Sequence, residues 1–318
     1  MNQQFIIAVD WGTSLLRAYL CRVNDCETLE LHACAHGKGV AKLNGAFEKE
    51  LFDNIAPWLN AYGNLPILMA GQIGSSIGWK ETKYLGCPIS PSAVASACHT
   101  FICREQQIAI VPGLHCSHDN QYRDVMRGEE LQVLGWLAQK PEHMEGDHLV
   151  CLPGTHTKWV LVKNGKVTLF KTAMTGELYD LLSNGSVLIQ QSAQHFNEAA
   201  FIDGAQYTLG SEFGSFSHGL FSVRSKQLFN ELEQKHAKAY LSGLLLGTDV
   251  RAALNATEWQ LNKNTLVHII GNPTLADLFA KTLSLRDIKS VQYNVEEITL
   301  SGFSSLFQNL ALHDVYKA

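Results

Sequence analysis

The sequence predicts an α/β fold made of two related domains, and two observations support this prediction. Short apolar runs typical of buried strands alternate with longer segments in which apolar residues have helical spacing. A strand–turn–strand pattern around a Gly-Thr pair also occurs twice, at Gly12-Thr13 and at Gly154-Thr155, about 140 residues apart. We therefore expect one domain over residues 1–140 and a second over residues 146–318, with a polar linker between them (KPEHMEGD, 140–147).

The composition is that of a globular protein and argues against several other classes. Hydrophobic residues make up 46% of the chain and charged residues 17%. A net charge of −5 without a Lys/Arg-rich run argues against nucleic-acid binding, and no apolar stretch approaches the ~20 residues that span a membrane. The first residues, MNQQFIIAVD, lack the features of a signal peptide, so we expect a cytoplasmic protein with its eight cysteines reduced.

The first expected hairpin has a strand at residues 5–9, a polar turn at 10–14 and a returning strand at 16–23. Asp10 ends a buried strand, where a carboxylate needs a partner. That partner could be a hydrated Mg²⁺, with the amides of Gly12 and Thr13 free to meet phosphate. An ordinary hairpin in which Asp10 caps its own turn explains the stretch equally well.

The rest of the first domain alternates strands and helices. A third strand is expected at 28–35, a helix at 47–62 and strands at 66–70 and 108–111, followed by a helix at 129–139 that begins with two acids. The loop at 71–79 (GQIGSSIGW) follows a buried strand, where α/β sheets place ligands. A flexible connector is the alternative, and the Trp in the loop favours a ligand loop.

Residues 148–166 repeat the layout of the first hairpin, with an apolar strand, the Gly154-Thr155 turn and a returning strand. A strand is then expected at 166–170 and a helix at 174–182. The segment 239–254 predicts an apolar helix with small residues on one face, as where helices pack closely. A strand at 266–270, helices at 275–283 and 302–310 and a glycine corner at Gly271 complete the domain.

The order of these motifs resembles the superfamily of sugar kinases, actin and heat-shock ATPases. Within it, the chain resembles the 2-dehydro-3-deoxygalactonokinase family essentially end to end. The most specific pieces are DWGTSLLRAYL (10–20), MAGQIGSSIGWK (69–80), VPGLHCSH (111–118), VMRGEE (125–130), LPGTHTKWV (152–160), MTGEL (174–178) and LSGLLLG (241–247).

This resemblance implies two ribonuclease-H-like domains with mixed sheets that face a central ATP and substrate cleft. It implies ATP and Mg²⁺ as cofactors and a small-molecule sugar acid as the acceptor. The implied reaction transfers the γ-phosphoryl group of ATP to the 6-hydroxyl of 2-dehydro-3-deoxy-D-galactonate, which gives the 6-phosphate and ADP in galactonate catabolism.

The resemblance also implies roles for individual residues around the nucleotide. Asp10 matches the acid that holds Mg²⁺, usually through water, and Lys158 could neutralise charge on the moving phosphoryl group. The second turn lacks the acid present in many superfamily members, so metal binding is expected to rest on Asp10. The residues that match phosphate or adenine contacts are Gly12, Thr13, Arg17, Gly154, Thr155 and Gly271.

The catalytic base and the acceptor site are implied by the same resemblance. Glu129 stands after Gly128 where related sugar kinases have an Asp that accepts the hydroxyl proton, with Glu130 and Asp124 as alternatives. The candidates for binding the sugar acid are Gly74, Ser75, Trp79 and, for its carboxylate, Arg127.

Two other functions remain open at this point. The substrate could be another sugar acid, such as 2-dehydro-3-deoxygluconate, because a loop sequence does not show which epimer it binds. A non-catalytic, ATP-dependent switch protein on the same fold is the second alternative; the acid at Glu129 and the loop at 71–79 argue against it. A homodimer is compatible with the sequence, which does not decide the oligomeric state.

Overall fold

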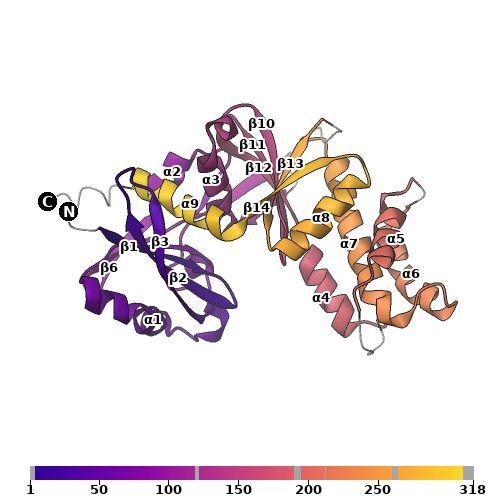
Figure 1. Cartoon of the computed structure of the whole chain (residues 1–318), viewed down its shortest axis with the longest axis horizontal. Coiled ribbons are helices and arrows are strands. Elements are labelled where there is room, and N and C mark those ends of the chain that lie inside the picture. Colours follow the sequence, from indigo (N-terminus) through magenta and orange to yellow (C-terminus); the bar gives the residue numbers. More distant parts are fainter. Residues whose placement is uncertain (1–3, 119–121, 190–194, 212, 260–263, 311–318) are drawn as a thin grey trace. The chain divides into compact units, whose positions relative to one another are not determined.

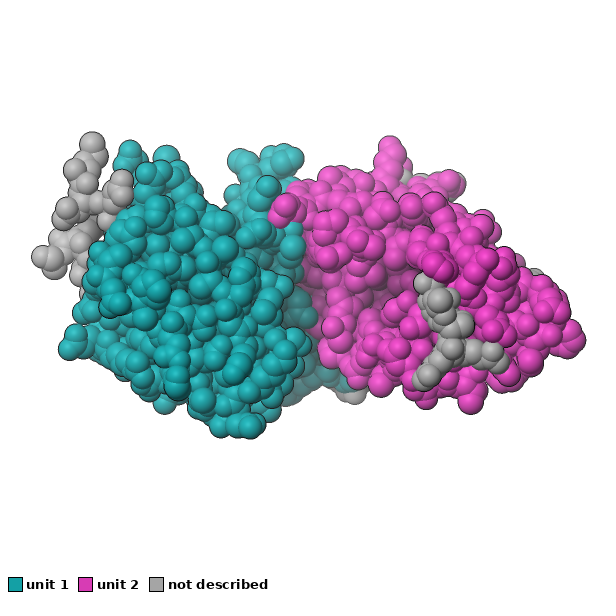
Figure 2. Space-filling model, turned by 60° about the horizontal axis from the view of Figure 1, so that its bottom comes forward, with its two compact units in different colours: residues 1–147, 162–170, 295–318 teal, residues 148–161, 171–294 magenta. Residues whose placement is uncertain are grey.

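The computed structural model describes residues 4–118, 122–189, 195–211, 213–259 and 264–310. The chain forms two compact units, which Figure 2 shows in different colours. Unit 1 comprises Met1–Asp147, Val162–Phe170 and Val295–Ala318, and unit 2 comprises His148–Leu161 and Lys171–Asn294. This division differs from the expected domains 1–140 and 146–318, because the last helix of the chain belongs to unit 1.

Unit 1 contains a six-stranded mixed sheet in the order β3-β2-β1-β4-β7-β6 (Figure 1). β1 runs parallel to β4, and β4 runs parallel to β7, whereas the pairs β1–β2, β2–β3 and β6–β7 are antiparallel. Its strands are β1 (Phe5–Trp11), β2 (Leu15–Val23), β3 (Leu29–Lys38), β4 (Ile67–Gly71), β6 (His99–Cys103) and β7 (Gln106–Ile110). β1 begins with five apolar residues, Phe5–Val9, and all of them are buried, as is typical of an interior strand that is covered on both faces.

Four helices of unit 1 lie among its described residues: α1 (Phe47–Tyr62), α2 (Pro91–Ser96), α3 (Glu129–Gln139) and α9 (Val295–Asn309). The apolar face of α1, with Phe47, Leu51 and Ile55, packs in one core with β1, as its helical spacing predicts. α3 and α9 approach each other at glycines. A Cβ atom on Gly135 would lie 1.9 Å from the Ile298 carbonyl oxygen, which explains why a helix so late in the chain belongs to unit 1.

A small sheet in the order β5-β8-β9 completes unit 1. Its strands are β5 (Tyr84–Gly86), β8 (Gly113–His118) and β9 (Tyr122–Met126). The Sγ of Cys116 and the Nε2 of His118 lie 3.2 and 2.9 Å from the carbonyl oxygen of Phe170. These contacts bring the segment Val162–Phe170 to this sheet.

The five-stranded sheet has the order β12-β11-β10-β13-β14, which repeats the order β3-β2-β1-β4-β7 of the first sheet. β10 is parallel to β13, and β13 is parallel to β14, as in the corresponding strands of the first sheet. Its strands are β10 (Asp147–Leu152), β11 (Thr157–Lys163), β12 (Lys166–Ala173), β13 (Leu266–Gly271) and β14 (Lys289–Asn294). The predicted α/β fold with mixed sheets is confirmed.

The helices described in unit 2 are α4 (Thr175–Gly185), α5 (Glu198–Leu209), α6 (Phe216–Leu228), α7 (Ala237–Leu254) and α8 (Pro273–Ser284). α7 has the small-residue face expected from its sequence, and α5 packs against it: a Cβ atom on Gly243 would lie 1.9 Å from the Phe201 carbonyl oxygen. Within the described residues, no helix is both long and apolar enough to cross a membrane.

Candidate functional site

In unit 1, the ends of β1 and β4 meet the start of α3. Trp11 and Gly71 are partners in the parallel register of these strands. Gly71 has a φ of +96°, and a Cβ atom there would lie 2.7 Å from the Trp11 carbonyl oxygen. Gly128 has a φ of +109°, and a Cβ atom there would lie 3.5 Å from the Gly71 Cα. Both positions favour glycine, and together they bring the first residue of α3 to the carboxyl ends of two parallel strands.

Asp10 lies near the carboxyl end of β1 and forms an ion pair with Arg17 across the β1–β2 hairpin. The two residues are register partners, and the Arg17 Nη1 lies 3.1 Å from the Asp10 Oδ2. Burial nevertheless raises the pKa of Asp10, Arg17 lowers it, and the charge of Glu129 raises it further. Asp10 and Glu129 are therefore close enough to repel each other in their ionised forms.

The first Gly-Thr turn, at Gly12 and Thr13, is held by backbone hydrogen bonds. The Gly12 amide donates to the Leu15 carbonyl over 2.9 Å, and the Gly12 and Thr13 carbonyls accept from the amides of Val40 and Ala41. The Thr13 side chain is exposed. This leaves the hydroxyl of Thr13 at the surface of a rigid turn next to Asp10.

The two acids that begin α3 lie in different environments. Glu129 is partly exposed, and its Oε2 accepts the Arg127 amide over 3.1 Å. Glu130 is fully buried, and its Oε2 accepts the Gly128 amide over 2.7 Å. Burial raises the pKa of Glu130 to about 8, with a further contribution from Glu129, so Glu130 is mainly neutral at pH 7. Of the two, Glu129 is the acid that a ligand can reach.

The raised pKa of Glu130 predicts a pH-dependent effect of Glu130→Gln on stability. Between the ordinary value of 4.5 and about 8, the unfolded chain loses this proton while the folded chain keeps it. The contribution of Glu130 to stability is therefore fully present below pH 4.5 and is lost as the pH rises through 8. Glutamine has no proton to lose and still accepts the Gly128 amide. As the pH rises, the free energy of unfolding of Glu130→Gln should therefore increase relative to that of the wild type, by roughly a few kcal/mol.

Urea unfolding of both proteins at pH 5 and pH 8 measures this difference. Glu142→Gln, at an exposed acid, is the matched control and should show the same small difference at both pH values. An equally small change for Glu130→Gln at both pH values would show that Glu130 titrates normally in the folded protein.

The loop that contains Gly74 and Ser75 is anchored to the segment before α3. The Thr82 amide donates to the Gly74 carbonyl over 2.9 Å, and the Ser75 Oγ donates to the Gln72 carbonyl over 2.7 Å. The Gln72 Nε2 donates to the Arg127 carbonyl over 3.3 Å. Gly74 and Ser75 are buried at the base of this loop.

Arg127 is buried and is bound within unit 1. Its guanidinium donates to the Thr82 hydroxyl over 2.5 Å and to the Thr82 carbonyl over 2.8 Å, and it lies 4.4 Å from the centre of the Tyr84 ring. Trp79 packs edge-on against Phe101, with ring centres 5.3 Å apart. A contact of Arg127 with a substrate carboxylate would compete with its bonds to Thr82, so this role stays a prediction.

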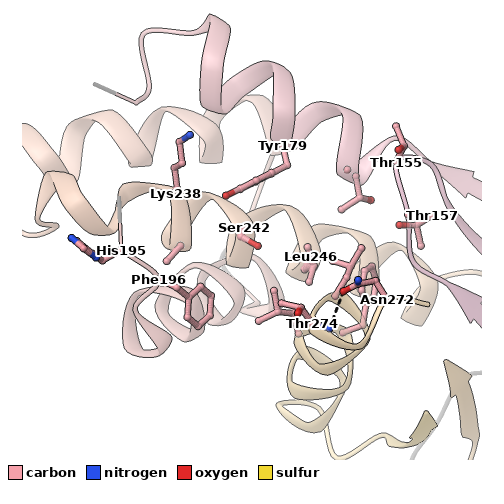
Figure 3. Close-up of a pocket in the computed structure, with 17 residues that line it drawn as sticks. Thr155, Thr157, Tyr179, His195, Phe196, Lys238, Ser242, Leu246, Asn272 and Thr274 are labelled. Carbon is pink, nitrogen blue, oxygen red and sulfur yellow. Dashed lines mark hydrogen bonds between the residues drawn. The ribbon is translucent and has the colours of Figure 1, made fainter. Parts of the chain in front are cut away.

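Unit 2 contains a cavity of about 660 Å³ (Figure 3). Thr155 and Thr157 lie at one end of the cavity and His195 and Phe196 at the other, with Ser242 of α7 between them. Its apolar lining comes mainly from three helices and one short segment. The lining residues are Gly154, Thr155, Thr157, Thr175, Gly176, Tyr179, His195, Phe196, Lys238, Ala239, Ser242, Leu246, Asn272, Thr274, Leu275, Leu278 and Phe279.

The second Gly-Thr turn forms the polar end of this cavity together with the start of α4. A Cβ atom on Gly176 would lie 2.4 Å from the Gly154 carbonyl oxygen, so α4 approaches the turn closely. The Glu177 amide donates to the Thr155 carbonyl over 3.0 Å, and the His156 Nε2 lies 2.5 Å from the Glu177 Oε2. Gly154 and Thr155 therefore lie on a turn that lines a cavity, and their contact with phosphate stays a prediction.

Two other predicted residues lie near this turn but do not line the cavity. Lys158 is the second residue of β11, and its side chain is only 4% exposed. Gly271 ends β13, and a Cβ atom there would lie 3.2 Å from the Pro153 Cδ. The next residue, Asn272, lines the cavity and accepts the Thr274 amide at the start of α8 over 3.0 Å.

The structure adds one acid that the sequence did not point to. Asp249 of α7 is buried, and its carboxylate accepts hydrogen bonds from the Trp159 Nε1 over 2.9 Å and from the Thr175 Oγ1 over 2.6 Å. Burial raises its pKa to about 6, while Thr175, Trp159 and Thr157 lower it. Asp249 is therefore ionised at neutral pH. The partners lie 74 and 90 residues away in the chain, so no local motif indicated the cluster.

Among the residues that the structure describes, no group of three or more His, Cys, Asp and Glu side chains could hold a metal ion. A cation bound mainly by water and phosphate remains compatible with Asp10. Its carboxylate is raised in pKa and faces the repulsion of Glu129, which a nearby cation would relieve.

The chain is similar to known proteins over nearly its whole length. The sequence profile of the 2-keto-3-deoxy-galactonokinase family matches residues 10–306. A probable 2-dehydro-3-deoxygalactonokinase from Rhizobium meliloti (strain 1021) is 33% identical over 306 residues, which cover 95% of this chain and 96% of that protein. The 2-dehydro-3-deoxygalactonokinase of Escherichia coli (strain K12) is 35% identical over 77% of this chain and 78% of its own length.

Solved structures agree with these sequence matches. A crystal structure of a Sinorhizobium meliloti protein of the same family has a TM-score of 0.79 and 30% identity, and the match covers 96% of this chain and 97% of that one. An activator of 2-hydroxyisocaproyl-CoA dehydratase from Clostridium difficile has a TM-score of 0.50 at 9% identity over 99% and 98% of the two chains, which shows a shared fold alone. With its profile, its relatives and its fold in agreement, this chain belongs to the 2-keto-3-deoxy-galactonokinase family.

Proposed function

We propose that the protein transfers the γ-phosphoryl group of ATP to the 6-hydroxyl of 2-dehydro-3-deoxy-D-galactonate, which gives the 6-phosphate and ADP in galactonate catabolism in the cytoplasm. Membership of the family supports a kinase acting on this class of sugar acid. The observation that carries the proposed mechanism is the pair Asp10 and Glu129, two electrostatically coupled acids at the edge of the sheet in unit 1.

The cavity in unit 2 supports the binding of ATP. Its volume is in the range of small-molecule sites, and Leu246, Leu278 and Phe279 offer an apolar surface to a flat base. Its other end combines the backbone of Gly154 and Thr155 with the first turn of α4, where the helix dipole favours anions. We propose that the adenosine lies against the apolar side chains of α8, the helix that follows the corner at Gly271, and that the phosphates lie at the polar end.

In the proposed mechanism, Glu129 accepts the proton of the attacking hydroxyl, whose oxygen then bonds to the γ-phosphorus as ADP leaves. Glu129 suits this role because it is partly exposed and begins a helix beside Asp10, whereas Glu130 is buried and neutral. Phosphoryl transfer depends mainly on positioning and on charge stabilisation. We assign the phosphate contacts to Gly12, Thr13 and Arg17 in unit 1 and the neutralisation of charge to Lys158 in unit 2.

Asp10 is the proposed ligand of Mg²⁺, through water. A bound Mg²⁺ would supply charge neutralisation of the ATP phosphates. Asp10 forms an ion pair with Arg17, which orients its carboxylate.

We assign the sugar acid to the loop of Gly74 and Ser75, with Trp79 beside the sugar chain. The bonds of Arg127 to Thr82 support a role in holding this loop next to Glu129, through the Arg127 amide that donates to the Glu129 carboxylate. Direct binding of the substrate carboxylate by Arg127 is the alternative role that its sequence position predicts.

An assay of ADP release over a panel of sugar acids tests this function. We expect rapid, Mg²⁺-dependent release of ADP with 2-dehydro-3-deoxy-D-galactonate, and slower release with 2-dehydro-3-deoxygluconate and with plain aldonates. Higher kcat/KM for the gluconate epimer would change the proposed substrate. ATP binding without release of ADP for any member of the panel would favour the ATP-dependent switch.

A further inference from the structure

We propose that Asp249 is a positioning residue, which holds the start of α4 against the second phosphate turn and so shapes the phosphate end of the cavity. This inference rests on the proposed binding of ATP in unit 2. It concerns a residue that lies outside the cavity lining and would act through the threonines that form it.

The partners of Asp249 connect the elements that build this end of the cavity. Thr175 is the first residue of α4, Trp159 lies within β11, and Asp249 itself lies on α7. The Thr175 hydroxyl and the Trp159 indole donate to different oxygens of one carboxylate, Oδ2 and Oδ1. Thr157, the first residue of β11, is close enough to lower the pKa of Asp249, although its buried hydroxyl forms no hydrogen bond with the described residues.

Two of these partners line the cavity directly. Thr157 and Thr175 face it beside Gly154 and Thr155 (Figure 3, which labels Thr155 and Thr157). Because an ionised carboxylate only accepts hydrogen bonds, the hydroxyl of Thr175 must direct its proton toward Asp249. Asp249, which does not line the cavity, thereby determines the orientation of the Thr175 hydroxyl.

The same carboxylate also controls how closely α4 approaches the turn. Gly176 follows Thr175, and its Cα packs against the carbonyl of Gly154 at a distance that leaves no room for a Cβ atom. The Glu177 amide then bonds to the Thr155 carbonyl. If the bond between Thr175 and Asp249 is lost, the first turn of α4 loses its anchor, and the phosphate turn loses the surface against which it packs.

The apolar lining of the cavity depends less on Asp249, because the hydrogen bonds to its carboxylate from Thr175 and Trp159 do not come from that lining. It is formed by side chains such as Leu275, Leu278 and Phe196, which come from α8 and from the segment before α5. Loss of the anchor should therefore weaken contacts to the phosphates of ATP and leave contacts to the adenosine largely unchanged. A general loss of folding would affect both.

The test measures the affinities of ATP and of adenosine for the full-length wild type, Asp249→Asn and Thr175→Val by calorimetry. We expect the Kd for ATP to rise about 10- to 100-fold in both variants, as for loss of a buried hydrogen bond to a charged group, while the Kd for adenosine changes less than about threefold. Thr175→Val removes the same bond from the other side, so it decides the question if Asp249→Asn does not fold.

Trp159→Phe is the matched control, because it removes the other hydrogen bond to the same carboxylate from a residue that does not line the cavity, and it keeps an aromatic ring against Phe279. It should lower stability and leave the ratio of the two affinities unchanged. An unchanged ratio in Asp249→Asn and Thr175→Val, or an equal change in Trp159→Phe, would overturn the inference while the proposed function stands. A wild type that does not bind ATP would overturn both.

Discussion

Glu129→Gln is expected to lower kcat by about 100- to 10,000-fold while ATP still binds. The substitution keeps the size of the side chain and its ability to accept the Arg127 amide, so the start of α3 should be preserved. It removes the carboxylate that would accept the proton of the attacking hydroxyl. Release of ADP under saturating substrates measures kcat, and calorimetry with ATP alone measures binding.

Glu130→Gln is the neighbouring control for this prediction. Glu130 is fully buried and mainly neutral at pH 7, so an amide at this position should leave kcat within a few fold of the wild type. Asp124 of β9 provides a second control, because its Oδ1 already accepts the Val125 amide over 2.8 Å. Near-normal turnover of Glu129→Gln would assign the base to whichever of Glu130→Gln or Asp124→Asn loses activity.

The sequence predicted most of the features that are local in the chain. The hairpin around Gly12, the helix over Phe47–Tyr62 and the Gly-Thr turn at Gly154 each depend on neighbouring residues, and the structure contains all three. Helical spacing and turn glycines are sufficient for such elements, because their geometry repeats within a few residues.

The features that the sequence did not show depend on contacts between distant residues. α9 belongs to unit 1 because its backbone approaches α3 at Gly135 and Gly302, more than a hundred residues apart. The cluster around Asp249 likewise joins α4, β11 and α7. A single glycine or a single acid in an apolar helix is compatible with many different neighbours. The sequence therefore does not show which residues these positions contact, and only the folded structure does.

The contacts of Arg127 in the candidate site also could not be predicted from the sequence. Its position next to Glu129 was noticeable in the sequence, and a cation near a sugar-acid site indicated a carboxylate contact. In the structure, its guanidinium donates a hydrogen bond to the Thr82 carbonyl and lies over the Tyr84 ring. Both residues lie more than 40 residues before Arg127, so their contacts with its side chain could not be predicted from the local sequence.

Asp10→Asn is expected to abolish Mg²⁺-dependent turnover, with a loss of at least about 100-fold at any Mg²⁺ concentration tested. Asparagine keeps the size of the side chain and an oxygen that can accept from Arg17, so the β1–β2 hairpin should remain intact. It removes the negative charge that would hold the hydrated cation. It also removes the repulsion with Glu129, so a purely structural role for Asp10 would predict an equally active and more stable protein.

The control for Asp10→Asn is Glu30→Gln in the same antiparallel layer. Glu30 of β3 forms an ion pair with Arg22 of β2, as Asp10 of β1 does with Arg17 of β2. Both side chains of the Glu30–Arg22 pair are exposed, whereas Asp10 is only 24% exposed. Exposed ion pairs contribute little to stability, so Glu30→Gln should retain wild-type turnover and Mg²⁺ dependence. The measurement is the rate of ADP release against Mg²⁺ concentration for the three proteins. If Asp10→Asn kept its Mg²⁺-dependent rate, the opening hairpin would hold no metal, and the acid at position 10 would serve only to fix Arg17 at the turn.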